Sequence, residues 1–598
     1  MARLTVAPTI VVLGAGALPV AERIRARYQG ATIHALAGRA EGDVAFSELG
    51  AHLRALYARG NPVVALCAAG IVIRCVAPCL ADKGVEPPVL AVAEDGSAVV
   101  PLLGGLTGVN LLAREIAETL GIAPAITTSG ELRFGACVLN PPEGYALADI
   151  GAGKRFVSDL LAGASTRVDG AAPWLEGVAL PVDAAGSHAI RVTPRRAGGA
   201  GSGELLIHPR SVVVALAEGF AHQVESLATP AQAADHEAGG DPLARRILDA
   251  LAAADLSPLA LAALVAPRQC MREVALARAA RELGVPLRFV ASEADPAGDA
   301  AALLDAALAA GSIDASPAIA LDDHGKPSKS LAIAIAEAPV DANRLGQARG
   351  SLTVLGLGPG RADLLAPAAR LALAEATDIL GYATYVRMAG PFRADQRVHE
   401  TDNREELQRA RHAFELAAQG RRVAMVSSGD PGVFAMAAAV LEALDGAGEP
   451  AWDEVALEVV PGVSAAFATA AEAGAPLGHD FCVISLSDNL KPWGVIEERL
   501  ALAARADLVM AFYNPISKAR PWQLDRALEI LREIRAADTV VVLGRDVGRP
   551  GAGLRSLTLG ELRAADVDMR TMVIVGSSKT RRFASAEREW IYTPRFYD

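Results

Sequence analysis

Short runs of β-branched and other apolar residues alternate with amphipathic, Ala- and Leu-rich segments along most of the chain. The runs at 9–14, 62–70 and 87–94 are typical of buried strands, and the segment 107–121 is typical of a helix with Thr107 as its N-cap and Gly121 at its end. Strands that alternate with helices form open, mostly parallel sheets. The pattern therefore predicts an α/β fold.

With 598 residues the chain is too long for one hydrophobic core, because domains average about 150 residues. Polar, glycine-containing stretches at 195–203, 229–242 and 341–350 are typical of linkers. The sequence predicts a multidomain α/β protein with four parts: 1–128, a middle segment and linker at 129–203, 204–345 and 350–598.

The formal net charge is −12, and the basic residues cluster only in short pairs such as Arg195-Arg196. Nucleic acid is therefore not expected as the main partner. The apolar stretch 4–21 could imitate a signal peptide, but its prolines and glycines favour a strand, a turn and a helix. No segment is expected to span a membrane, and a cytoplasmic location is predicted.

Six cysteines in a chain of this length do not indicate a disulfide scaffold. Cys75 and Cys79 are one helical turn apart, with Cys67 nearby, so a metal or cluster site is conceivable, with Cys137 or Cys270 as a fourth ligand. Buried cysteines in apolar elements are the favoured interpretation, and no metal site is predicted.

The stretch "SLTVLGLGPGRADLL" (351–365) opens the last part like a nucleotide-binding fold. A dinucleotide fingerprint needs G-x-G-x-x-G, with backbone amides free to bind pyrophosphate. Here Gly356, Gly358 and Gly360 are spaced by two, and Pro359 has no N–H to donate. The stretch instead predicts a tight turn in which the backbone approaches a bulky ligand closely.

Further glycine- and proline-bearing loops follow strands in the last 250 residues, and their order is specific. The chain reads, in sequence, "VLGLGPGRADLLAPAA", "SSGDPGVFAMA", "VVPGVSAA", "PLGHDFCVISLSD", "AFYNPISKAR", "VVLGRDVGRPG" and "TMVIVGSSKTR". Together these motifs closely resemble the precorrin-3B C(17)-methyltransferases of the tetrapyrrole methylase family, over residues 351–598. A methylase that acts on another ring carbon is an alternative. The strings "GHDFCVISLSD" and "GRDVGRPG" argue against it, because they resemble the carbon-17 enzymes specifically.

The resemblance implies a two-lobed fold, S-adenosylmethionine (SAM) between the lobes, a precorrin or cobalt-precorrin substrate in an adjacent trough, and a homodimer. It also implies cooperation with other corrin-pathway enzymes. The cofactor-binding residues that it implies are Pro359, Ser428, Gly429, Asp430, Val433, Ser464, Ala465 and Asn514.

The family reaction also contracts the macrocycle, a step that begins with a deprotonated hydroxyl and needs a general base. His479, Asp480 and Asp488 in "GHDFCVISLSD" are the candidates. His479 is favoured because an imidazole titrates near neutral pH. Neighbours in a strand point to opposite faces, so Asp480 is not expected to orient His479.

The first 345 residues resemble the cobalt-precorrin-5A hydrolase family more weakly. Residues 70–78 and 82–90 fit its motifs, but "GGLTGVN" (104–110) has Leu106 where that family has His, and "ALAEGFAH" (215–222) replaces its glycine-rich turn. Two hypotheses stay open for this half: a working hydrolase, or a carrier or scaffold that holds a corrin intermediate without turning it over.

Overall fold

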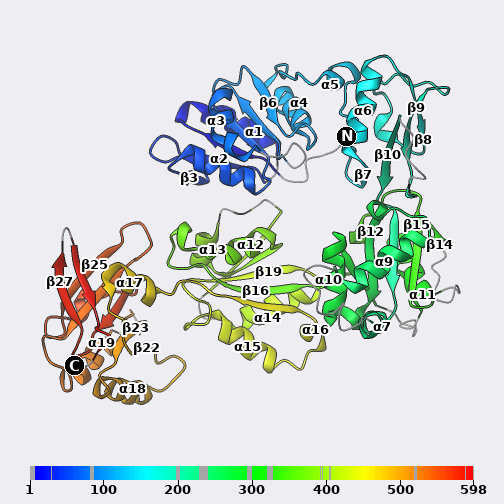
Figure 1. Ribbon diagram of the computed structural model, residues 1–598. Helices are drawn as coiled ribbons and strands as arrows, with labels where there is room; N and C mark the ends of the chain where they lie inside the picture. The colour runs from blue at the N-terminus through cyan, green and yellow to red at the C-terminus, as the bar shows by residue number, and fades with distance from the viewer. Residues whose placement is uncertain are drawn as a thin grey trace. The chain divides into compact units, whose positions relative to one another are not determined.

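The computed structural model describes residues 7–596 apart from 29, 81–85, 197–202, 228–239, 292–298, 319–327, 391, 393–394, 403–405, 518–520 and 586–587. The predicted linkers at 195–203 and 229–242 therefore lie largely outside the described residues. The chain forms two compact units, each considered by itself: Met1–Arg349 with Pro391–Asp395, and Gly350–Gly390 with Gln396–Asp598 (Figure 1). No helix among the described residues is long and apolar enough to cross a bilayer.

The first unit begins with a six-stranded sheet that is parallel except for its last strand. The strands lie in the order β3 (Val44–Phe46), β2 (Thr32–Leu36), β1 (Thr9–Val12), β4 (Val63–Leu66), β5 (Val89–Val92) and β6 (Val99–Leu103). One face packs against α1 (Leu18–Arg27) and α4 (Val109–Leu120), and the other against α2 (Leu49–Ala58) and α3 (Ala69–Val76). The alternating pattern of the sequence thus has its expected outcome, a sheet covered on both faces.

Two local expectations in this sheet have different outcomes. Helix α4 ends at Gly121, which adopts the left-handed conformation as predicted, but its N-cap is Gly108, not Thr107. The Thr107 hydroxyl instead donates to the carbonyls of Glu86 (2.7 Å) and Gly104 (3.1 Å).

All six cysteines are free, and no group of His, Cys, Asp and Glu in the described ranges could hold a metal ion.

The middle segment has a sheet of its own. Its strands lie in the order β7 (Tyr145–Leu147), β10 (Glu204–Pro209), β9 (His188–Val192) and β8 (Thr166–Asp169). They pack against α5 (Ser129–Phe134) and α6 (Ile150–Leu161) through a small core that includes Phe134 and Phe156. Strand β10 therefore belongs with the middle segment, although the sequence placed a boundary between 203 and 204.

The last sheet of the first unit is mixed. Its strands lie in the order β13 (Leu287–Val290), β12 (Leu261–Pro267), β11 (Val212–Leu216), β15 (Leu331–Ala336) and β14 (Ala315–Ala318). Its helices are α7 (Phe220–Leu227), α9 (Pro242–Ala253), α10 (Val274–Leu283) and α11 (Ala300–Gly311). The fully buried β11 and β12 read as continuous apolar runs, as strands covered on both faces do.

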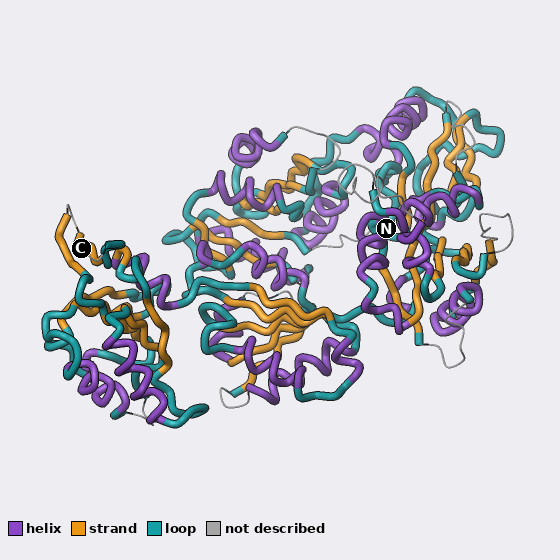
Figure 2. The backbone as a smooth tube through the Cα atoms, turned by 60° about the horizontal axis from the view of Figure 1, so that its bottom comes forward, coloured by secondary structure: helices purple, strands orange, loops and turns teal. Residues whose placement is uncertain are grey.

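The second unit consists of two α/β lobes, and the first has an all-parallel sheet. Its strands lie in the order β18 (Arg397–Thr401), β17 (Asp378–Tyr382), β19 (Arg422–Ser427), β16 (Ser351–Gly356) and β20 (Ala456–Val460). Figure 1 shows one face covered by α12 (Pro367–Glu375) and α13 (Ala383–Ala389), and the other by α14 (Glu406–Ala418), α15 (Met436–Asp445) and α16 (Pro450–Asp453). Figure 2 shows the strands of this sheet side by side between these helices.

The second lobe has a mixed five-stranded sheet and a small three-stranded one. The large sheet has the order β22 (Phe481–Ser485), β23 (Val509–Tyr513), β26 (Thr571–Val575), β24 (Val540–Arg545) and β25 (Gly553–Thr558). The small sheet joins β21 (Gly474–Ala475), β28 (Arg588–Tyr592) and β27 (Arg581–Ser585), and the lobe's helices are α17 (Ala465–Ala473), α18 (Trp493–Arg505) and α19 (Gln523–Arg532). The predicted α/β class and two-lobed last part are confirmed.

The direction of the strands determines which loops can share a site in the second lobe. Strands β22 and β23 are parallel, and both β23 and β24 run antiparallel to β26. The carboxyl ends of β22, β23 and β24 therefore lie at one edge of the sheet, with Ser485, Tyr513 and Arg545 as their last residues. Open α/β sheets place ligands at such carboxyl edges.

Candidate functional site

The turn after β16 is held against the turn after β19 by the backbone alone. The amide of Gly358 donates to the carbonyl of Gly429 (3.1 Å), and the amide of Gly429 donates back to the carbonyl of Gly358 (2.8 Å). Both residues have positive φ, 66° and 69°, which favours glycine. A Cβ built on Gly356 would lie 2.3 Å from the Gly429 carbonyl oxygen, so the close approach requires a residue without a side chain.

Asp430 links two of the predicted cofactor loops. Its Oδ1 accepts from the amide of Gly432 (2.8 Å) within its own loop, and its Oδ2 accepts from the amide of Gly462 (3.0 Å) in the loop after β20. A carboxylate that accepts from backbone amides forms strong, charge-assisted bonds. Asp430 therefore stabilises the arrangement of both loops.

We expect Asp430→Ala to weaken SAM binding by roughly tenfold to a hundredfold, because losing one charge-assisted hydrogen bond costs about 1.5–3 kcal/mol. The affinity is measured by calorimetric titration of the purified chain with SAM. Asp363→Ala is the matched control, since this exposed carboxylate pairs only with Arg361 among the interactions that the structure shows. A dissociation constant unchanged by Asp430→Ala would contradict this role.

Pro359 and Ser428 contact the same arginine of the second lobe. The Nε of Arg549 donates to the Pro359 carbonyl (3.1 Å), and its Nη2 donates to the Ser428 hydroxyl (3.1 Å). Arg549 follows β24 at the carboxyl edge, one residue after Gly548, whose φ is 84°. The arginine thus connects the two glycine-rich turns of the first lobe to the second lobe.

Ser464 and Ala465 begin helix α17, which leads from the first lobe to the second. The Ser464 hydroxyl accepts from the amide of Phe467 (3.5 Å) as an N-cap. The next amide, of Ala466, donates to the hydroxyl of Tyr513 (3.2 Å) at the end of β23. Asn514 follows Tyr513 with a φ of 51°, and its amide donates to the Ser485 hydroxyl (3.1 Å).

Val433 lies in the Asp430 turn, and its amide donates to the Asp430 carbonyl (3.3 Å). The next residue, Phe434, has a φ of 52° and a side chain that is 52% exposed. Its ring lies 5.4 Å from that of Tyr513 and 5.8 Å from the Nζ of Lys491. Burial lowers the pKa of Lys491. This exposed ring adds an aromatic surface beside the loops that the sequence predicts to bind the cofactor.

The three candidate bases lie at two different ends of β22. His479 and Asp480 precede the strand, whereas Asp488 follows it, and a residue in a strand advances about 3.3 Å. His479 is thus roughly 20 Å along the chain from Ser485, at the edge opposite to Asn514. Strand direction therefore does not bring the favoured base, His479, to the cofactor loops.

His479 and Asp480 are in contact through the Asp480 backbone. They belong to the turn before β22, where the Asp480 amide donates to the Nδ1 of His479 (2.7 Å) and the Asp480 carboxylate lies 3.6 Å from the same nitrogen. The alternation of a strand does not apply to this turn. The Asp480 carboxylate makes no hydrogen bond with the Nδ1 of His479, which already accepts from the Asp480 amide, so the expectation that Asp480 does not orient His479 stays a prediction.

Asp488 lies beyond the carboxyl end of β22. Its Oδ1 accepts from the Nε2 of Gln523 (2.9 Å), the buried first residue of α19. Of the three candidate bases, Asp488 is therefore the one at the same edge as Asn514 and Tyr513.

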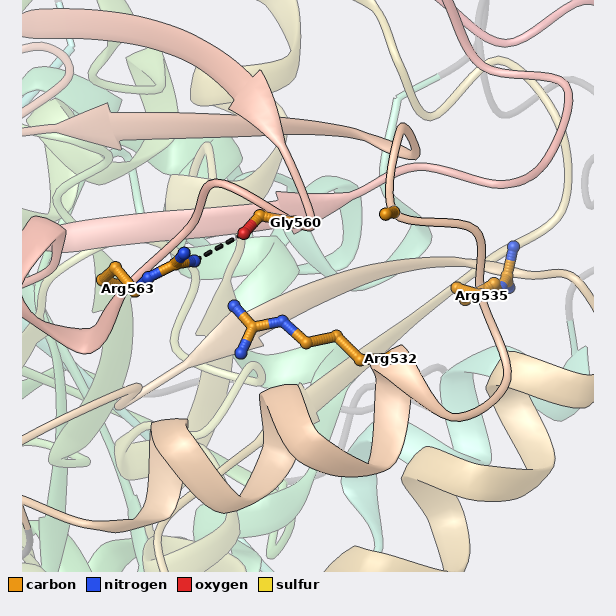
Figure 3. Close-up of a pocket in the computed structure, with 5 residues that line it drawn as sticks. Arg532, Arg535, Gly560 and Arg563 are labelled. Atoms are coloured by element: carbon orange, nitrogen blue, oxygen red, sulfur yellow. Dashed lines mark hydrogen bonds between the residues drawn. The ribbon is translucent and has the colours of Figure 1, made fainter.

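A pocket of ≈ 470 Å³ in the second lobe lies away from this edge (Figure 3). It is lined by Arg532, Arg535 and Arg563 near the amino end of β24, but Arg532 donates to the carbonyls of Leu559 and Leu562, and Arg563 to those of Gly560 and Leu562. Arg535 is paired with Asp507. The guanidinium groups of Arg532 and Arg563 thus satisfy the carbonyls of one turn, as the bond between Arg563 and Gly560 in Figure 3 illustrates.

Sequence reasoning singled out neither Arg549 nor Gln523. Both are within or near motifs. Nothing in the sequence shows that Arg549 reaches turns 190 and 121 residues earlier, as its bonds to Pro359 and Ser428 do. The available signal was an arginine between Gly548 and Pro550 in "GRDVGRPG", in the loop after a predicted strand.

Comparison with known proteins finds a family match in each half of the chain. The profile of the Tetrapyrrole (Corrin/Porphyrin) Methylases matches residues 351–563, and that of the Cobalamin synthesis G N-terminal domain matches residues 51–131. The chain is 53% identical over 249 residues to a precorrin-3B C(17)-methyltransferase of Sinorhizobium sp, which covers 42% of this chain and 97% of that protein.

Two further relatives match the same part. The cobalamin biosynthesis protein CobIJ of Mycobacterium tuberculosis is 46% identical over 285 residues, which are 47% of this chain and 54% of that protein. The crystal structure of the methyltransferase CobJ is 52% identical and covers 41% of this chain and all of that one, with a TM-score of 0.39. The 53% identity over 97% of the Sinorhizobium protein, together with the profile match at residues 351–563, shows that the chain belongs to the tetrapyrrole methylase family and is a methyltransferase of cobalamin biosynthesis.

Proposed function

We propose that residues 350–598 use SAM to methylate precorrin-3B at carbon 17 and contract its ring to give precorrin-4. The observation that carries this proposal is the 53% identity over nearly the whole length of a precorrin-3B C(17)-methyltransferase. The two lobes, with their glycine turns at facing loops, provide the architecture that such a reaction needs.

The residues present fit SAM. A Cβ built on Gly356 or on Gly462 would lie only 2.3 Å from the carbonyl oxygen of Gly429. The loops therefore form a compact surface of backbone atoms. The Ser427 hydroxyl beside them is buried and has no hydrogen-bond partner among the described residues. When bound, SAM supplies a methyl group on a positively charged sulfur.

The residues of these loops contribute to methyl transfer by holding SAM in a fixed orientation. A carboxylate held at the sulfur would stabilise the charged ground state more than the transition state, in which the charge is lost. Asp430, the carboxylate among the predicted cofactor residues, is bonded to the amides of Gly432 and Gly462. Catalysis thus rests on orientation by Pro359, Ser428 and the other loop residues.

We assign the general base of ring contraction to Asp488. Its carboxylate lies at the carboxyl edge of the second-lobe sheet, and the Gln523 amide orients it. A carboxylate so placed takes the proton from the substrate hydroxyl, and the resulting alkoxide starts the rearrangement.

Incubation of the purified chain with SAM and precorrin-3B tests the proposal. The product is identified by its mass, which reports the added methyl group, and by its visible spectrum, which reports contraction. Methylation without the spectral change would support the proposed methyl transfer and contradict the proposed ring contraction. No methyl transfer by folded protein would contradict the proposal.

For the first unit, one observation favours a corrin-binding role without hydrolysis. Leu106, which stands where the hydrolase family has His, lines a cavity of ≈ 280 Å³ in the described structure. An alkyl side chain cannot carry a proton. The profile match at residues 51–131 supports the kinship of this part with the cobalamin synthesis G proteins.

We therefore expect the chain to release no acetaldehyde from cobalt-precorrin-5A at a useful rate. The measurement is acetaldehyde production, compared with that of a hydrolase with an intact His. Leu106→His is the informative companion variant, because it restores the proton carrier at the cavity. Wild-type acetaldehyde production equal to that of the hydrolase would overturn the expectation.

A further inference from the structure

The arginine-lined pocket of the second lobe (Figure 3) lies where two loops meet at the amino end of β24. Ala537 comes from the loop before β24, and Gly560 comes from the loop after β25. The Gly560 amide donates to the Ala537 carbonyl (2.8 Å), which ties the two loops together. The pocket volume of ≈ 470 Å³ is within the roughly 300–1,000 Å³ of sites that hold a small organic ligand.

Two guanidinium groups of this pocket are fixed by backbone carbonyls. Arg532, the last residue of α19, donates from Nε to the Leu559 carbonyl (3.2 Å) and from Nη2 to the Leu559 and Leu562 carbonyls. Arg563 donates from Nη1 to the carbonyls of Gly560 and Leu562. Because both groups share the Leu562 carbonyl, they lie close together, and Figure 3 shows the two side chains pointing toward one another.

The carbonyl bonds leave other donors of these two groups open to a ligand. The Nη1 of Arg532 and the Nε and Nη2 of Arg563 have no hydrogen bond, and neither side chain has an ion pair, within the residues that the structure describes. Both side chains are exposed, so solvent and solutes reach them. Two positive charges held side by side repel each other, and an anion bound between them would remove that repulsion.

The lining of the pocket carries an excess of positive charge. Arg535, the third arginine that lines it, has a side chain that is only 4% exposed and is paired with Asp507. No carboxylate is among the described residues that line the pocket. The charges of Arg532 and Arg563 are therefore the two that the lining itself does not balance.

Carboxylates of the surrounding chain do not cancel this excess. Asp566 accepts from the Arg563 amide (2.8 Å), but its Oδ1 is paired with Arg555 (2.7 Å). Glu561 accepts from the amide and hydroxyl of Thr558 (2.9 and 3.0 Å). Two more carboxylates directly follow lining residues in the chain and do not line the pocket themselves, Glu533 and Asp538.

We propose that this pocket binds the phosphate group of a small organic phosphate, with the phosphate oxygens paired to Arg532 and Arg563. A phosphate monoester carries about −1.5 to −2 charges near neutral pH and several acceptor oxygens, so one phosphate satisfies two guanidinium groups at once. The rest of the volume holds the organic substituent, beside Ala537 and Gly560. The site is separate from the predicted SAM loops, which follow the carboxyl ends of their strands.

Calorimetric titration of the purified full chain with ribose 5-phosphate tests the pocket, and ribose and inorganic phosphate are the comparison probes. Ribose 5-phosphate should bind at millimolar concentration or below, and ribose should give no heat. Equal binding of ribose would overturn the recognition of phosphate. Binding of inorganic phosphate without binding of ribose 5-phosphate would overturn the organic ligand, and no binding of either phosphate would overturn the site.

Arg563→Gln should weaken the binding of ribose 5-phosphate roughly tenfold or more, because it removes charge-assisted hydrogen bonds to the phosphate. Arg505→Gln is the matched control, since it removes one positive charge from the exposed end of α18 in the same lobe and Arg505 does not line the pocket. An unchanged dissociation constant for Arg563→Gln would overturn the assignment, as would equal weakening by Arg505→Gln.

A second measurement on the wild-type chain does not depend on the folding of a variant. Phenylglyoxal modifies exposed arginines, and peptide mass mapping gives the rate at each one. Ribose 5-phosphate at about ten times its dissociation constant should slow the modification of Arg563 roughly tenfold and leave that of Arg505 unchanged. Equal rates at Arg563 with and without ribose 5-phosphate would overturn the site.

Discussion

Asp488→Asn should reduce the rate of precorrin-4 formation by roughly 10² to 10⁴, the usual contribution of a positioned general base. This loss corresponds to about 3–5.5 kcal/mol in the activation free energy. The amide of asparagine can still contact Gln523, so the local structure is retained, but it cannot take a proton. SAM affinity should stay within about twofold, because the variant leaves every cofactor loop intact. Single-turnover kinetics and calorimetric titration measure the two quantities.

His479→Ala is the companion measurement, since His479 precedes β22 and lies at the opposite edge of the sheet. It should form precorrin-4 within about twofold of the wild-type rate, because His479 lies away from the proposed site. If His479→Ala lost the activity while Asp488→Asn kept it, the base would be at the amino end of β22 and the assignment would be wrong.

Gly356→Ala should lower SAM affinity by roughly a hundredfold. Its φ is not in the left-handed region, so the effect comes from space: the added Cβ lies 2.3 Å from the Gly429 oxygen and 2.9 Å from the Pro431 side chain. Relief of such a contact requires movement of the two turns, and overpacking of this kind costs about 1–3 kcal/mol. Calorimetric titration with SAM measures the loss.

Gly553→Ala is the control for Gly356→Ala, because nothing lies within 4 Å of a Cβ at Gly553. It should bind SAM as the wild type does. Thermal unfolding of both variants separates local damage from unfolding. Gly356→Ala with wild-type affinity would show that the close approach of the two turns has no part in cofactor binding.

The sequence indicated which glycine- and proline-bearing loops lie together, because their signals are local. Each is a strand followed by glycine or proline, and parallel strands bring such loops to one edge without further information. Pro359, Ser428, Gly429, Asp430 and Ser464 indeed belong to adjoining turns of one lobe. Their contacts with SAM remain a prediction.

The position of the base could not be predicted in the same way. The string "GHDFCVISLSD" places His479 and Asp488 nine residues apart, but only the boundaries of β22 show that a whole strand separates them. The imidazole was favoured for its usual pKa, which is a property of the residue and carries no information about which edge it occupies.

The sheet of the middle segment was missed for a different reason. Strands such as β8 (Thr166–Asp169) and β9 (His188–Val192) are short and carry His, Arg and Asp, so their apolar runs are weak. Pairing with β10 (Glu204–Pro209) across a predicted linker supplies the stability that their own composition does not indicate.

The reciprocal bonds between Gly358 and Gly429 have a thermodynamic consequence for ligand association. Since both turns are fixed by main-chain bonds within the folded chain, their conformational entropy is lost on folding and not when a ligand arrives. Association then carries little cost for loop ordering, which is the general advantage of a preorganised site. Amide hydrogen exchange at Gly358 and Gly429 should accordingly be slow already in the ligand-free protein, with little further slowing when SAM is added.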